Sequence, residues 1–205
     1  MKGITLSLSL FFPFILFSQT KFSPNQIQVT AGRSTHGTRD MRGIIFITEY
    51  TNYFKKSLFW TIALGGTIHD GSRPLFFNDA YGNAIDGSIR YTTAGVQATS
   101  HLGYSFIKTS RHELGIKVGA LLRYQSSSYY DRVSISYPLA TGLPIPVINF
   151  DNTTPQRTYA FGGSAQILYN YSINKAISLG IQAGFQTDTN GDTITQAAFT
   201  IGKRF

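Results

Sequence analysis

The 205-residue sequence predicts an all-β protein, an eight-stranded antiparallel up-and-down transmembrane β-barrel with an N-terminal signal peptide. Three observations lead to this fold class. Eight segments alternate apolar residues with polar or small ones, the connections between them alternate between short and long, and the last segment ends on an aromatic residue, Phe205. Because successive side chains of a strand point to opposite faces, a period of two indicates strands with two different faces.

The N-terminus has the pattern of a secretory signal. Lys2 gives a positive start, residues 3–17 carry no charge, and the small residue Ser18 follows. This apolar stretch is shorter than the roughly 20 residues that a membrane-spanning helix needs. We therefore expect residues 1–18 to be a signal peptide cleaved after Ser18, and residues 19–205 to form one barrel domain. A buried N-terminal helix is the alternative.

The eight alternating segments follow one another along the rest of the chain. The clearest alternation lies in the fifth, where apolar residues stand mostly at even positions and small or polar residues at odd ones. The final segment alternates Phe199 and Ile201 with Thr200 and Gly202. In order, the segments are 26–35, 43–54, 58–69, 89–106, 113–125, 157–173, 177–187 and 193–205.

The apolar positions of each segment support its prediction as a strand, because together they would form one continuous apolar face of the barrel. In the first four segments they include Ile27, Val29, Ala31, Ile44, Phe46, Tyr50, Trp60, Ile62, Leu64, Val96, Leu102 and Tyr104. In the last four they include Leu114, Ile116, Val118, Tyr159, Phe161, Ile167, Leu179, Ile181, Phe185, Phe199 and Ile201.

Composition separates a membrane barrel from a soluble one. The second face of the segments is rich in Gly, Thr, Ser and Gln and has few charges, which suits a narrow polar lumen. A soluble antiparallel barrel or sandwich, the alternative, usually carries a charged solvent face. The net charge of +8 comes from scattered basic residues, so no nucleic-acid partner is predicted, and the absence of Cys excludes disulfides and thiolate metal ligands.

Connection lengths give the orientation. Short turns fall near residues 55–57, 108–112 and 174–175, whereas the longer connections are 35–42, 70–90, 126–156 and 188–192. Barrels of the outer membrane have short periplasmic turns and longer outer loops.

These features resemble the small outer-membrane β-barrel family of the OmpA/OmpX type, without a peptidoglycan-binding domain. The resemblance covers the whole mature chain and implies a cell outer-membrane location, reached by export through a cleaved signal. It also implies that Phe205 belongs to the insertion signal read by the barrel-assembly machinery. Outer-membrane lipid and lipopolysaccharide would surround the wall. We expect no cofactor, no metal and no catalytic residue.

Charged residues on the lumen face form a candidate network. Glu49, Lys117 and Arg123 are in phase with the polar face, and a buried carboxylate must be paired or neutral. We therefore expect Glu49 to pair with Lys117 or Arg123. His69 is followed by Asp70 and Ser72, but this cluster is common in loops by chance and does not predict an enzyme.

The long connections carry candidate binding residues. Alternation in 132–137 and again in 146–150 predicts a hairpin above the membrane. Exposed loop aromatics suit binding of a protein or glycan, so the predicted function is structural or partner-binding; a small-solute pore and a lipid A-modifying enzyme are alternatives. An alternative of equal weight is that the two longest loops pack on each other as a lid. The loop candidates are Phe76, Phe77, Tyr81, Tyr129, Tyr130, Tyr137 and Phe150.

Overall fold

The computed structural model describes residues 24–37, 41–79 and 81–205. The predicted signal peptide, residues 1–18, lies outside them. No helix in the described part of the chain is long and apolar enough to span a membrane. The one helix given bounds there, α2 (Pro138–Thr141), has four residues.

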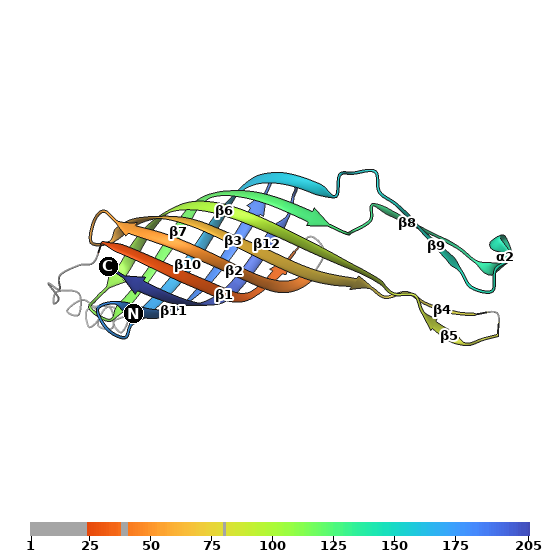
Figure 1. Ribbon diagram of the computed structural model, residues 1–205, viewed down its shortest axis with the longest axis horizontal. Helices are drawn as coiled ribbons and strands as arrows, with labels where there is room; N and C mark the ends of the chain where they lie inside the picture. The colour runs from red at the N-terminus through yellow and green to blue at the C-terminus, as the bar shows by residue number, and fades with distance from the viewer. Residues whose placement is uncertain (1–23, 38–40, 80) are drawn as a thin grey trace, which may run out of the picture.

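Eight antiparallel strands close into a barrel in the order β1-β12-β11-β10-β7-β6-β3-β2 (Figure 1). Each strand corresponds to one of the eight predicted segments, with ends that differ by up to four residues, so the predicted fold class is confirmed. The strands are β1 (Asn25–His36), β2 (Met41–Tyr53), β3 (Leu58–Arg73), β6 (Ile89–Lys108), β7 (His112–Ser127), β10 (Arg157–Ser172), β11 (Ile177–Asp188) and β12 (Thr193–Arg204).

The last strand closes the barrel by pairing with the first. The register runs from Gln26 opposite Arg204 to His36 opposite Ile194. Phe205 lies just beyond β12, and its backbone N–H donates to the carbonyl of Asn25 at 3.0 Å. Closure leaves no open edge in the main sheet, which is the condition for a sheet to cross a lipid bilayer.

The two faces of the wall differ as the alternation predicts. Every second residue points outward, where large apolar side chains such as Ile44, Leu64 and Phe199 are exposed. The residues between them point into the lumen, where polar side chains such as Gln28 and Thr61 are buried. An apolar exterior around a polar interior is the arrangement of a transmembrane barrel.

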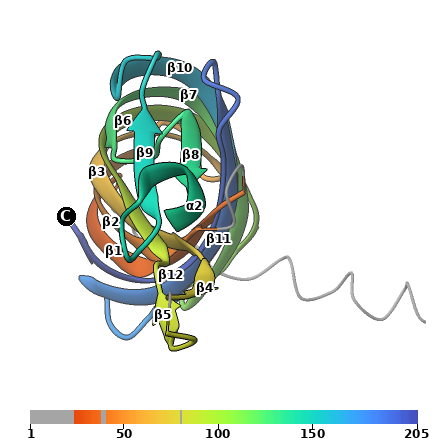
Figure 2. The ribbon, with the colours of Figure 1, turned by 90° about the vertical axis from the view of Figure 1, so that its right-hand side faces the viewer.

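Two hairpins extend beyond one end of the barrel, called here the hairpin end; the short turns mark the opposite, turn end (Figures 1 and 2). β8 (Arg132–Ser136) pairs with β9 (Val147–Asp151), and α2 lies in the connection between them, so the hairpin predicted in this loop is confirmed. β4 (Phe76–Asn78) pairs with β5 (Ala84–Asp86).

The second hairpin was not predicted. Residues 70–90 were expected to be a loop, but the β3–β6 ladder continues to the pair Arg73 and Ile89 and then gives way to β4 and β5. The two hairpins stand apart in Figure 1, so they do not pack on each other as a lid.

Candidate functional site

The lumen holds the three charged residues singled out from the sequence, and all three are buried. The Lys117 ammonium is ion-paired with the Glu49 carboxylate, which also accepts a hydrogen bond from the Gln28 amide at 2.6 Å. The pair therefore joins β2 to β7 across the barrel. With a cation and an amide donor on the same carboxylate, the charge of Glu49 is compensated inside the wall.

Arg123 belongs to a different cluster, nearer the hairpin end. Its guanidinium donates to Asp188 at 2.8 Å, Gln186 at 2.5 Å and Gln97 at 3.1 Å. Asp188 was assigned to an outer loop in the sequence analysis, but it ends β11 and points inward. Its alternation with Gln186 and Gly184 was the signal that could have placed it in the lumen.

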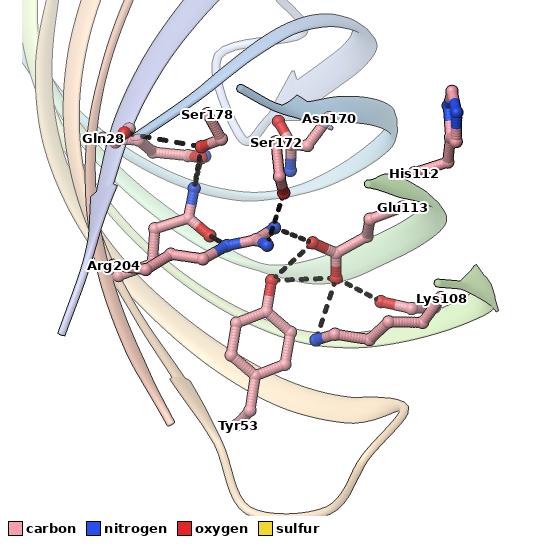
Figure 3. A network of polar contacts seen from close by, with 12 residues as sticks. Gln28, Tyr53, Lys108, His112, Glu113, Asn170, Ser172, Ser178 and Arg204 are labelled. Carbon is pink, nitrogen blue, oxygen red and sulfur yellow. Dashed lines mark hydrogen bonds and ion pairs between the residues drawn. The ribbon is translucent and has the colours of Figure 1, made fainter. Parts of the chain in front are cut away.

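A third cluster closes the turn end (Figure 3). The Glu113 carboxylate accepts hydrogen bonds from Tyr53 at 2.8 Å and Ser105 at 2.7 Å, and it forms ion pairs with Arg204 at 2.8 Å and Lys108 at 3.2 Å. The cluster thus connects β2, β6, β7 and the final strand. The sequence analysis missed it, although Glu113 is in phase with Lys117.

The three clusters decide what the lumen can do. Each one bridges strands on different sides of the barrel through buried charged groups, so ion pairs cross the lumen near both ends and between them. Barrels of eight strands are just wide enough for their interior to be filled by side chains. Such a lumen is suited to rigidity rather than to passage of a solute.

Two histidines, His101 and His69, are structural partners inside this interior. His101 lies 2.6 Å from the Ser164 hydroxyl, and His69 lies 2.8 Å from the Ser34 hydroxyl. Asp70 points to the outer wall, where it accepts a hydrogen bond from Thr92, so His69 and Asp70 face opposite sides of β3. No group of three possible metal ligands occurs among the described residues.

Aromatic residues brace the base of the β8–β9 hairpin. Tyr129 and Tyr130 stack with ring centroids 4.9 Å apart, Tyr130 contacts Phe150 at 5.3 Å, and Tyr91 of β6 contacts Tyr129 at 4.8 Å. Tyr130 is buried. Three of the predicted binding residues, Tyr129, Tyr130 and Phe150, therefore lie in this brace, and Tyr130 offers no free surface.

The other loop candidates divide by exposure. The Phe77 ring lies over Gly87, whose missing side chain leaves room for it. Phe76, Tyr81, Tyr137 and Phe150 are exposed. These four side chains are available to a partner at the hairpin end.

Sequence reasoning missed the apolar tip of the β8–β9 hairpin. Residues 133–150 contain no charged residue, and the turn of this segment carries Leu139, Leu143 and Ile145. Leu139 is fully exposed at 104%, and the other two are about half exposed at 49% and 50%. Aliphatic residues on a loop are hard to interpret in a sequence, because they are usually buried.

The connection at the base of the hairpin is held by one carboxylate. Asp131 accepts hydrogen bonds from the backbone N–H groups of Thr153 at 2.6 Å and Thr154 at 2.7 Å, and from both hydroxyls. These donors lower the pKa of the Asp131 carboxyl to about 2. Asp79 plays the same part in the β4–β5 hairpin, where Asn83 and Tyr81 donate to it and lower its pKa.

Solved structures show the same fold with very different sequences. Ail, the attachment invasion locus protein of Yersinia pestis in complex with the heparin analogue sucrose octasulfate, matches with a TM-score of 0.51 and 9% identity, covering 90% of this chain and 100% of Ail. Neisserial surface protein A matches with a TM-score of 0.53 and 8% identity, covering 88% and 97%. No protein-family model and no curated protein matches the chain. The protein is thus a transmembrane barrel with the fold of the small outer-membrane barrels.

Proposed function

We propose that this protein is an integral barrel of the Gram-negative outer membrane that presents its β8–β9 hairpin to a protein partner outside the cell. The observation that carries the proposal is the apolar tip, defined as Tyr137, Leu139, Leu143 and Ile145. A side chain as exposed as Leu139 costs free energy in water, and contiguous exposed apolar residues mark interaction sites.

The chemistry of the tip favours a protein over a glycan. The buried centre of a protein interface is depleted in charged residues and enriched in aromatic and apolar ones. The tip has that composition, with the Tyr137 hydroxyl as its polar group. A sulfated glycan, such as the heparin analogue bound to Ail, would need cations, and residues 133–150 contain none.

The hairpin also has the mechanical properties of a presenting arm. The stacked rings of Tyr129 and Tyr130 fix the base of the hairpin on the barrel, together with Asp131, which accepts hydrogen bonds from four donor groups of Thr153 and Thr154. A rigid base lowers the conformational entropy lost when a partner binds. Export through a cleaved signal and assembly through a terminal signal at Phe205 belong to the same proposal.

A solute pore is the second candidate function, but the buried ion pairs that cross the lumen argue against it. Conduction would require a water path past the Glu49–Lys117 pair and past the Arg123 and Glu113 clusters. Single-barrel conductance in a planar bilayer would revive this candidate. We expect no catalysis, because the His–Ser contacts face the lumen rather than the lipid.

A photo-crosslinking experiment tests the proposal. A photoreactive residue is placed at Leu139, with a matched control at Lys175 in the turn between β10 and β11. Cells carrying the full-length protein are irradiated in their native surroundings. We expect a discrete adduct from position 139 that disappears when Leu143 and Ile145 are both changed to Ser. Adducts from position 175 alone, or adducts insensitive to the serine changes, would contradict the proposal.

A further inference from the structure

The outer wall carries an apolar groove near the hairpin end. It spans β2, β3, β6 and β7, and its volume is about 440 Å³. In the register, Gly66 stands between Phe46 on one side and Val96 on the other, so a residue without a side chain separates two bulky ones. A Cβ at Gly66 would meet nothing closer than a backbone oxygen at 3.5 Å. The groove over Gly66 is therefore open space on the outer surface of the barrel.

Arginines border this groove. The row of paired residues at its end nearest the hairpins crosses six strands in the order Arg33, Ile44, Ile68, Ala94, Ser126 and Arg157. The row thus begins and ends with an arginine. Arg42 is the next outward-facing residue of β2 beyond Ile44. Arginine side chains therefore border the apolar groove at its end nearest the hairpins.

The kind of cation differs between the two ends of the barrel. In the described part of the chain, the lysines other than Lys117 all lie at the turn end, and none lies at the hairpin end, where the cations are arginines. A guanidinium binds phosphate through two parallel hydrogen bonds, whereas an ammonium acts as a point charge. The arginines at the hairpin end are Arg33, Arg42, Arg73, Arg90, Arg132 and Arg157.

Three of these arginines are available to a ligand. Arg33, Arg42 and Arg157 are exposed, and none of them forms an ion pair with a described residue. One carboxylate faces the same area, because Asp70 is paired in register with Arg42. Asp70 accepts a hydrogen bond from the Thr92 hydroxyl at 2.6 Å, so a neighbouring strand already holds it. The border of the groove keeps a net positive charge.

We propose that this groove and its arginines form a binding site for lipopolysaccharide. One acyl chain of the lipid lies in the groove over Gly66, and a phosphate of the glycolipid headgroup is bound by Arg42 or Arg157. The groove lies in the half of the wall nearest the hairpins, which is the half that contacts the outer leaflet. Lipopolysaccharide is the phosphorylated glycolipid of that leaflet. The inference rests on the outer-membrane location proposed above and is independent of the hairpin's partner.

The wall provides a matched control. A second apolar groove of about 370 Å³ lies over β7, β10, β11 and β12 and includes Ala183 and Ala197. The outward-facing cation of β12 at the turn end is Lys203. Ala183→Leu fills the second groove and is the control for Gly66→Leu. Lys203→Gln removes an outward-facing cation and is the control for the arginine changes.

Native mass spectrometry of the purified full-length barrel in detergent tests the site, with lipopolysaccharide and phosphatidylglycerol as the two probes. We expect a one-to-one complex with lipopolysaccharide in preference to phosphatidylglycerol. Arg42→Gln combined with Arg157→Gln should weaken it about tenfold, the loss expected for one charge-assisted hydrogen bond. Gly66→Leu should weaken it as well, whereas Ala183→Leu and Lys203→Gln should not. Heat-modifiable migration on a gel shows that each variant is folded.

Three results would overturn the proposal: equal binding of phosphatidylglycerol, equal effects of Gly66→Leu and Ala183→Leu, or binding that survives both arginine changes. Replacing residues 132–151 with a short Gly/Ser linker should leave lipopolysaccharide binding unchanged. That variant separates the lipid site from the hairpin, since loss of crosslinks at the tip with lipid binding retained contradicts only the hairpin's function.

Discussion

The ion pair between Glu49 and Lys117 makes a quantitative prediction about stability. In Lys117→Met the ammonium is lost, and Glu49 keeps only the Gln28 amide as a donor. Lys117 is 1% exposed and Glu49 is 3% exposed, so water cannot readily replace the missing cation. Removing one partner of a buried pair costs about 3–5 kcal/mol. We expect the free energy of unfolding to fall by that amount at neutral pH.

The double variant distinguishes the pair from a simple packing effect. Glu49→Gln combined with Lys117→Met removes both charges, and a neutral side chain of similar volume replaces each one. Because replacing a whole buried pair is often close to neutral, the double variant should recover most of the lost stability. Lys203→Met is the control for loss of an outward-facing lysine at the turn end, and we expect a change within about 0.5 kcal/mol there.

Reversible urea unfolding of the barrel in lipid vesicles, followed by tryptophan fluorescence of Trp60, measures these differences. The slopes of free energy against urea should be the same for all variants, which indicates that the same surface unfolds. A loss below about 1 kcal/mol for Lys117→Met, or effects of the two changes that simply add, would refute the reasoning that the lumen pair is buried and coupled.

Three further predictions follow from the same structure. Deleting Phe205 should impair insertion into the outer membrane in cells, because the terminal residue belongs to the proposed insertion signal; wild-type levels of heat-modifiable protein would contradict this. Replacing residues 132–151 with a Gly/Ser linker should leave barrel folding intact, because the closed ladder lies elsewhere; loss of the heat-modifiable form would show that the hairpin is structural. The pKa of Asp131 is lowered to about 2 in the folded protein, whereas an unfolded Asp has a pKa of about 4. The stability that the Asp131 carboxylate gives to the hairpin base should therefore be fully present above pH 4 and be lost as the pH falls through about 2. The protection factors for amide hydrogen exchange at Thr153 and Thr154, taken relative to the intrinsic rate at each pH, should therefore stay high at pH 4 and fall near pH 2. Asp131→Asn should lower both protection factors at pH 6.

The strands were predictable because a membrane barrel imposes a strict physical constraint on its sequence. Each strand contacts lipid on one side and a narrow lumen on the other, so the period of two persists along its full length. Segment 113–125 shows this most clearly, and β7 (His112–Ser127) covers it. Register also follows, since a slip of one residue would turn Lys117 and Arg123 into the lipid.

The features that were missed depend on geometry that alternation does not encode. The β4–β5 hairpin contains only three residues in each strand, too few for a periodic signal. The Glu113 cluster gathers side chains from the ends of four strands, and the partners of Arg204 depend on how the barrel closes. The apolar tip was missed because Leu139 has the sequence signature of a buried residue.

The absence of cysteine in this chain allows a direct test of whether the barrel crosses the outer membrane with its hairpins outside. Single cysteines are introduced at Leu139 in the tip and at Lys175 in a short turn, and a membrane-impermeant maleimide is applied to intact cells and to lysed cells. If the hairpins lie outside the cell, Leu139→Cys is labelled on intact cells and Lys175→Cys is labelled only after lysis. Labelling of Lys175→Cys on intact cells, with Leu139→Cys protected until lysis, would contradict the orientation and with it the proposed function.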